Sequence, residues 1–285
     1  MFVKRKKIKL ALQFLCRWYR FKLMINVFLI FVIICTFSGV LAGMIGIGGG
    51  ALLVPLFLYV LPQFGIELYT MQMALGTSLA CVAVNVSIAT KSQIKRNGVD
   101  FEITKYWAFF IMIGGIIGSF WASGADDTIL KIIYVAVMLF IVSVRLFRPT
   151  KVFFSRNSLF KSGLIFPTSV GFVAATMGLG AGNAVPALGL FGVPMNRAVG
   201  TASFLGLFIA FPSSIVYAYA GYGAYDFSTY TVGFVHIPLF FVTVVISGLS
   251  VPIGVMLSHK MSSKVLNRVF CVVSLMLTLR MVSEI

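Results

Sequence analysis

The chain is a succession of long apolar stretches separated by short polar connections. Eight stretches come close to the roughly 20 residues that an α-helix needs to cross the hydrocarbon core of a bilayer. They cover about residues 24–47, 70–91, 104–122, 128–147, 163–179, 198–220, 230–257 and 264–283. Because a helix satisfies its own backbone hydrogen bonds in lipid, the pattern predicts an all-α polytopic membrane protein with about eight transmembrane helices.

Two further apolar pieces, residues 51–61 and 184–191, are too short to cross a bilayer alone. Each follows a glycine-rich segment and contains a proline, Pro55 or Pro186. Short helices after such breaks are typical of re-entrant segments and of the discontinuous helices of transporters. We therefore expect two short broken or re-entrant segments in addition to the spans.

The composition makes lipid the solvent for most of the chain. Hydrophobic residues form 60% and charged residues 11% of the 285 residues, and the mean hydropathy is +1.03. Soluble proteins carry roughly 25% charged residues, because their surfaces must stay polar. A water-soluble globule is thus excluded. A signal peptide is not expected either, because the first apolar run continues from Met24 towards Ile47 and is too long for one.

Basic residues outnumber acidic residues by 23 to 7, and many of them lie before residue 23. Beside apolar spans, such an arm is typical of a cytoplasmic segment attracted to anionic lipid, and a nucleic-acid partner is not expected. Residues 91–105 and 145–161 are also basic, whereas Asp126, Asp127 and the surroundings of Asp226 are acidic or nearly uncharged. The positive-inside rule places the two basic connections in the cytoplasm.

The cysteines predict neither a disulfide framework nor a metal site. None of the four forms a CxxC pair, and three lie in apolar runs: Cys16, Cys35, Cys81 and Cys271. Small buried cysteines of this kind are typical packing residues. No cofactor and no metal are therefore expected.

The chain also shows an internal repeat. Residues 39–50 match residues 171–182 at a constant offset of 132 (171 − 39), and an Ala-x-Gly-Thr element recurs at 74–77 and 198–201. Asp100 and Phe101 match Asp226 and Phe227 in the same order. The repeat divides the chain into a basic arm (1–23), a first repeat (24–147), a basic linker (148–162) and a second repeat (163–285). Loop charges leave open whether the copies are parallel or inverted.

The glycine clusters at 46–50 and 178–182 predict breaks at membrane depth. They do not resemble nucleotide-binding loops, because no Lys-Ser/Thr follows Gly50 and no strand precedes the glycines. Gly114 and Gly118 fit close helix packing better, since no polar residue accompanies them. In the clusters, glycines two apart do not share a helix face, and the helix itself is weakened. The positive dipole ends of the short helices, at Ala51 and Asn183, would suit an anion.

Polar side chains near the breaks complete the candidate site. Thr77 and Asn85 share one face of a span, with Ser78 adjacent, and Thr201 and Ser203 follow the second cluster. Thr77 and Thr201 fit a site and ordinary helix hydroxyls equally well, whereas buried amides such as Asn85 and Asn183 need external partners.

No Asp or Glu falls clearly within a span, so a carboxylate proton relay has no residue. His236 is alone in an apolar run, and we interpret it as a structural residue. Arg197 fits an anion attractant and an ordinary loop charge equally well. Asp127 and Lys131 have the spacing of an ordinary i,i+4 ion pair.

The two blocks GMIGIGGGALLVPLF (43–57) and MGLGAGNAVPALGLFGVP (177–194), with the downstream ALGTS and AVGTA, resemble the TauE/SafE family of bacterial membrane proteins. The resemblance covers nearly all of the chain after about residue 30. The second block is looser, with Ala181 in place of a glycine, and the basic arm is not part of the pattern. The resemblance implies a multi-pass inner-membrane protein and a probable exporter of sulfite, sulfonates or related organosulfur anions.

These observations predict a secondary transporter of a small anion in the cell inner membrane, working by alternating access between two repeats. A coupling ion is possible, carried by backbone carbonyls and hydroxyls. The alternative is a non-transporting membrane scaffold or assembly factor whose glycines only pack helices. An enzyme is not expected, and no catalytic residue is assigned. The predicted substrate-binding residues are Gly46, Gly48, Gly49, Gly50, Ala51, Pro55, Thr77, Ser78, Asn85, Gly178, Gly180, Gly182, Asn183, Pro186, Thr201 and Ser203.

Overall fold

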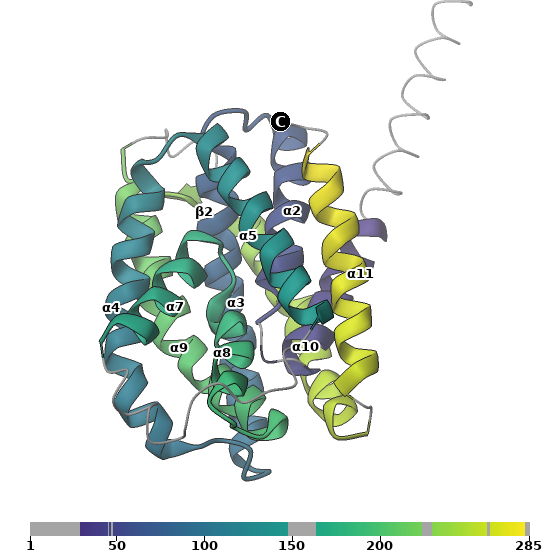
Figure 1. Ribbon diagram of the computed structural model, residues 1–285. Coiled ribbons are helices and arrows are strands. Elements are labelled where there is room, and N and C mark those ends of the chain that lie inside the picture. Colours follow the sequence, from purple (N-terminus) through teal and green to yellow (C-terminus); the bar gives the residue numbers. More distant parts are fainter. Residues whose placement is uncertain are drawn as a thin grey trace, which may run out of the picture.

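The computed structural model describes residues 29–44, 46, 48–147, 164–223, 230–260 and 263–282. The predictions for the basic arm 1–23, the linker 148–162 and the loop around Asp226 fall outside these residues. The described chain is mostly helical, as predicted, and Figure 1 shows its helices gathered side by side in one bundle.

The described part combines long helices with short helical pieces. The long helices are α3 (Thr70–Ile94), α4 (Phe101–Gly124), α5 (Asp127–Phe147), α9 (Met195–Ala220), α10 (Ile237–Lys260) and α11 (Ser263–Val282). The short helices are Leu29–Met44, α2 (Gly50–Val60), η1 (Leu61–Phe64), α7 (Ile165–Thr176), η2 (Gly180–Asn183) and α8 (Ala184–Leu190). The strands β1 (Thr231–Val232) and β2 (Val235–His236) pair antiparallel just before α10.

Helix length separates the predicted spans into two groups. In the described part of the chain, four helices are long and apolar enough to cross a membrane, namely Thr70–Ile94, Phe101–Gly124, Arg197–Ala220 and Ile237–Leu257. The helices α5 and α11 have 21 and 20 residues, or roughly 30 Å at 1.5 Å per residue. By contrast, α7 has 12 residues, and Leu29–Met44 also belongs to the shorter class. The stretch 163–179 therefore does not form a full-length span. The start of the stretch 24–47 lies outside the described residues.

The antiparallel pair α3 and α9 forms the centre of the bundle. Gly76 lies against Tyr217, and Gly206 lies against Val86, so the start of one helix meets the end of the other. Both helices are apolar and largely buried. They are thus enclosed by the other helices, whereas α4 and α10 turn large apolar side chains such as Phe109 and Phe241 outward. An outer surface of this kind is suited to lipid.

Two groups of parallel helices flank this centre. In the first, the helix Leu29–Met44 and α10 run in the same direction, because Gly39 packs on the backbone of Ser247 and Gly43 on that of Val251. In the second, α7 runs along α4. There, Gly114 and Gly118 pack on the backbones of Thr168 and Phe172, which confirms their interpretation as packing glycines. Small residues let helix backbones approach closely in a bilayer.

Asp127 connects two helix starts. Its carboxylate accepts the Met71 N–H at 2.7 Å and the Thr70 hydroxyl at 3.3 Å, and pairs with the Lys131 ammonium at 2.8 Å. The pair with Lys131 is the predicted i,i+4 pair. The sequence pattern did not reveal that the same carboxylate caps α3 from the start of α5, an arrangement that suits the positive end of a helix.

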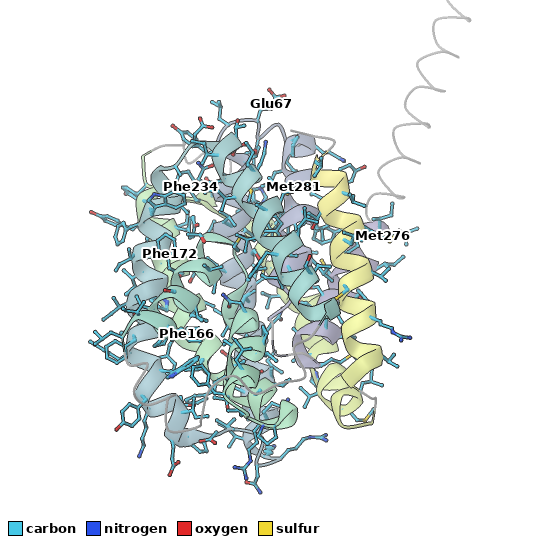
Figure 2. All side chains as sticks on the ribbon, in the orientation of Figure 1. Glu67, Phe166, Phe172, Phe234, Met276 and Met281 are labelled. Carbon is cyan, nitrogen blue, oxygen red and sulfur yellow. The ribbon has the colours of Figure 1, made fainter. Side chains whose placement is uncertain are left out.

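The connections separate into two ends of the bundle. One end holds the starts of α3, α5 and α10, with Glu67 and Phe234 near it in Figure 2. The other holds the α3–α4 loop with the basic Lys95 and Arg96, and the start of α9. The helix Leu29–Met44 begins at the first end, because it runs parallel to α10. The arm before it lies outside the described residues, so its cytoplasmic placement stays a prediction.

Candidate functional site

The first glycine cluster interrupts the chain between two helices. One helix ends at Met44, and α2 begins at Gly50. Gly46, Gly48 and Gly49 have φ angles of 73°, 71° and 82°. Residues with a Cβ rarely adopt this left-handed conformation, and glycine adopts it freely. The cluster therefore serves the path of the backbone, and the predicted helix break is present.

The second glycine cluster makes a similar break with one difference. It begins after α7 ends at Thr176, and Gly178 and Gly180 have φ angles of 64° and 58°. Ala181 has a φ of −83°, whereas Gly49, which holds the same place in the first cluster, is left-handed. The second break therefore accepts a side chain at Ala181 without strain, which explains the looser form of its motif.

The two breaks meet beside α3. A Cβ added at Gly50 would overlap the carbonyl oxygen of Gly178, so these backbones are in direct contact. The hydroxyl of Ser78 donates to the same Gly178 oxygen at 3.0 Å. Gly50, Gly178 and Ser78 are all buried. The structure thus brings both glycine clusters and Ser78 to one place.

Side chains from two helices bind the carbonyls of the first break, and a side chain from a third helix binds one of these two side chains. Asn85 Nδ2 donates to the Gly48 oxygen at 3.4 Å, and Ser38 Oγ donates to the Gly49 oxygen at 3.0 Å. Ser247 Oγ donates to Asn85 Oδ1 at 3.0 Å. Sequence reasoning found Asn85 but missed Ser38 and Ser247. The available signal was a serine within an otherwise apolar run.

The start of α2 offers backbone donors. Gly49 is its N-cap and has no capping side chain, so the N–H groups of Gly50 and Ala51 have no carbonyl partner within the helix. The next two are bonded, since Leu52 and Leu53 donate to the Gly49 oxygen at 3.0 and 3.3 Å. The Ala51 oxygen accepts the Tyr134 hydroxyl at 3.1 Å. A buried helix start of this kind favours negative charge.

Asn183 presents an acceptor at the second break. Its Nδ2 donates to the Val170 oxygen at 3.0 Å, while its Oδ1 is buried and has no hydrogen-bond partner. The Val170 oxygen can only accept, so the amide orientation is determined. The buried Oδ1 of Asn183 can therefore take a donor from a ligand or water.

Thr77 and Thr201 do not lie at the breaks. The hydroxyl oxygen of Thr77 accepts the His236 N–H at 2.9 Å, and that of Thr201 accepts the Asp100 N–H at 2.9 Å. Each threonine thus holds the connection that precedes a long helix, towards opposite ends of the bundle. Gly76, which precedes Thr77, packs closely against the backbone of Phe234. The structure assigns these threonines to helix starts instead of the candidate site.

The other predicted residues are placed as follows. Ser203 Oγ bonds back to the Val199 oxygen at 3.0 Å and lies against Gly46. Pro55 lies inside α2 and Pro186 in the first turn of α8, where a missing N–H costs nothing. Gly182 lies in η2. Arg197 lines an open surface pocket with Asp100 and Glu102 at the end of the bundle, away from the breaks.

His236 holds the start of α10 as a neutral base. Its Nδ1 accepts the Leu239 N–H at 3.2 Å, and its ring lies 5.7 Å from the ring of Phe64. Only the neutral imidazole can accept a hydrogen bond. Burial of His236 lowers its pKa below the usual value of 6.5. The geometry agrees with the structural role predicted for this lone histidine.

The pH dependence of stability follows from this pKa. Between the lowered pKa and about pH 6.5, the unfolded chain binds more protons than the folded one, so stability rises with pH. We expect the melting temperature of the purified protein to fall as the pH drops below about 6.5. His236→Asn, whose oxygen can accept the Leu239 N–H without titrating, should reduce that fall. Equal pH profiles for the two proteins would contradict the prediction.

Comparison with known proteins gives a consistent result. The family described as sulfite exporter TauE/SafE matches residues 30–281. A probable membrane transporter protein of Haemophilus influenzae is 25% identical over 215 residues, which cover 73% of this chain and 81% of that protein. A probable membrane transporter protein of Methanocaldococcus jannaschii is 25% identical over 239 residues, which cover 79% and 84%. No solved structure matches.

Proposed function

Because the chain belongs to the sulfite exporter TauE/SafE family, we propose that it is a secondary transporter that exports a small sulfur oxyanion, such as sulfite or a sulfonate. Its similarity to probable membrane transporters from a bacterium and an archaeon supports transport as the activity. The observation that carries the anion proposal is the contact between the two glycine breaks, where the uncapped start of α2 is buried.

The chemistry of the breaks suits an anion held without a charged side chain. Donors are available as backbone N–H groups at the α2 start, and the hydroxyl of Ser78 lies where the breaks meet. The oxygens of a sulfur oxyanion accept such hydrogen bonds, and the helix dipole adds attraction. The Asn183 oxygen has no partner and can accept a hydrogen bond, which favours ligands that also carry an O–H or N–H group.

The internal duplication belongs to the same proposal, and four pairs of contacts support it. Gly39 packs on Ser247 as Gly171 packs on Ile111, with offsets of 132 (171 − 39) and 136 (247 − 111). The other pairs match at these offsets and at 124 (201 − 77). Gly254 packs on Val40 as Gly118 packs on Phe172, and Gly76 packs on Phe234 as Gly200 packs on Gly98. Thr77 accepts the His236 N–H as Thr201 accepts the Asp100 N–H. In this alignment His236, and not Asp226, matches Asp100.

We propose that the copies are inverted. The matching helices α3 and α9 run antiparallel, and inverted repeats are common in transporters. Inversion with two short broken helices agrees with the charges of the two basic connections. It places the basic α3–α4 loop and the connection after α10 at the same end of the bundle. By the positive-inside rule that end is cytoplasmic.

Alternating access would then move groups of helices that mix the two sequence halves. The helix Leu29–Met44 and α3 pack with α10 from the second half, and α7 and α9 pack with α4 from the first half. These groups meet along α3 and α9. Rocking of one group against the other at this contact would open the breaks to each side in turn.

Anion flux is the direct test. Purified protein in liposomes should carry sulfite or a sulfonate at rates above empty liposomes and above chloride. Ser78→Ala should lower this flux about tenfold, because one hydrogen bond at the meeting point of the breaks is lost. Ser213→Ala, which removes a buried hydroxyl bonded to the Gly115 oxygen, is the matched control. Absence of flux with every anion, from protein that remains folded, would instead favour the scaffold alternative.

A further inference from the structure

A line of buried polar side chains runs between three parallel helices. It consists of two residues from each of the helix Leu29–Met44, α3 and α10, spaced three or four apart. We call these six residues the polar seam: Cys35, Ser38, Cys81, Asn85, Thr243 and Ser247. Each has an exposed fraction of 0%. The amide and hydroxyl groups among them are costly to bury in a hydrophobic protein unless they find hydrogen-bond partners.

The seam has two layers. In one, the thiols of Cys35 and Cys81 contact the Thr243 hydroxyl and the Phe240 oxygen, both at 3.9 Å. The other layer contains Ser38, Asn85 and Ser247 and reaches the first glycine break. Its oxygens are close together, since Ser38 Oγ and Ser247 Oγ lie 3.0 Å from the Gly49 oxygen and Asn85 Oδ1 respectively.

The second half of the chain builds its break without such a seam. The offsets of the proposed duplication match the six seam residues to apolar positions. These positions are Pro167, Val170, Leu205, Ile209, Trp107 and Ile111. All six are buried, and five belong to one apolar cluster. A glycine break beside α9 therefore folds against apolar side chains, so packing alone does not require the polar residues beside α3.

We propose that the layer of Ser38, Asn85 and Ser247, with the Gly48 and Gly49 carbonyls, is a sodium-ion site. This inference deepens the proposed function, because it names the coupling ion of the same break. The set offers two backbone oxygens, one amide oxygen and two hydroxyl oxygens, all uncharged. Unwound carbonyls and the negative end of a half-helix are suited to this cation.

The local geometry favours a small monovalent cation. Rotation of the Ser38 and Ser247 hydroxyl hydrogens frees both serine oxygens and Asn85 Oδ1 without moving the backbone. The Gly49 oxygen still accepts the N–H groups of Leu52 and Leu53. Oxygens 3.0 Å apart suit ligand distances of about 2.4 Å, as for Ca²⁺, whose radius is close to that of Na⁺. Ca²⁺ itself needs carboxylates, and no group of three or more His, Cys, Asp or Glu able to hold a metal occurs in the described chain.

Binding would link the cation to the proposed anion site. The Gly49 oxygen belongs to the candidate cation site, and the next residue, Gly50, starts α2 and contacts the second break. A cation beside this backbone would order the break and offset the charge of an anion at the α2 start. Each ion would then bind more tightly in the presence of the other, because the coupling is reciprocal.

Sodium binding can be measured without transport. Purified protein in detergent is melted in increasing NaCl, with choline chloride keeping the ionic strength constant. We expect the melting temperature to rise and saturate with Na⁺, as it does for any ligand of the folded state, and to stay flat with K⁺. Ser247→Ala should raise the half-saturating Na⁺ concentration about tenfold. The control Ser213→Ala, also a buried serine, should leave it unchanged.

A second measurement covers a variant that fails to fold. Binding of radioactive sodium to the wild-type protein should saturate and be displaced by unlabelled Na⁺ but not by K⁺. A flat melting temperature together with background binding would overturn the sodium site, as would equal effects of Na⁺ and K⁺. Anion flux that persists without Na⁺ binding would remove this site and leave the transport proposal intact. Na⁺ binding without anion flux would leave the sodium site intact and overturn the transport proposal.

Discussion

Replacing Gly50 by alanine is expected to abolish anion flux and to lower the melting temperature by roughly 10 °C, the fall that about 3 kcal/mol of destabilisation produces in a chain of this size. The added Cβ would overlap the Gly178 oxygen. Both groups belong to backbones of broken helices, so neither can move aside as a flexible side chain would. The two breaks must separate, and the α2 start loses its place beside the second break.

Gly189→Ala is the control for this variant. Gly189 lies in α8 of the second broken segment, and a Cβ there meets nothing within 4 Å. Alanine at a helical position with free space is neutral or stabilising by up to about 1 kcal/mol. Both melting temperature and flux are measured for the two variants. Normal flux in Gly50→Ala would show that contact between the breaks is not needed for transport.

The location of the breaks follows from the sequence because backbone conformation is a local property. Glycines two apart in an apolar run predict a break, and Gly46, Gly48 and Gly49 adopt the left-handed conformation that only glycine adopts freely. The length of the helix before the second break did not follow. Apolar runs at 24–47 and 163–179 have the composition of spans, and only the fold shows α7 ending at Thr176.

The roles of the polar side chains depended on tertiary contacts, which spacing does not reveal. Thr77 and Asn85 share a face of α3, yet Thr77 meets the connection before α10 while Asn85 meets the first break. Ser38 and Ser247 had no mark in the sequence beyond being polar in an apolar run. They contact the first break and Asn85 because the helix Leu29–Met44 and α10 pack together on α3. This packing joins residues about 200 positions apart in the sequence.

Substituting Gly39 or Gly171 by alanine should destabilise the protein by similar amounts, about 3 kcal/mol each. In each case the Cβ would overlap a backbone oxygen of a parallel helix, that of Ser247 for Gly39 and that of Ile111 for Gly171. The two sites lie in different helix pairs, one in each group of parallel helices. Equal penalties are expected because the proposed duplication makes the two contacts equivalent.

The comparison of these two variants tests the duplication itself. Melting temperatures in detergent should fall by roughly 10 °C for each, whereas Gly124→Ala, at the end of α4 with open space around its Cβ, should change little. If one substitution is tolerated and the other is not, the contacts are not equivalent, and the correspondence between the halves fails. Equal losses would instead extend the similarity from sequence to energetics. In that case the polar seam, present beside α3 and replaced by apolar residues beside α9, is the chemical difference between two otherwise equivalent halves, and the proposed sodium site would lie on one side only.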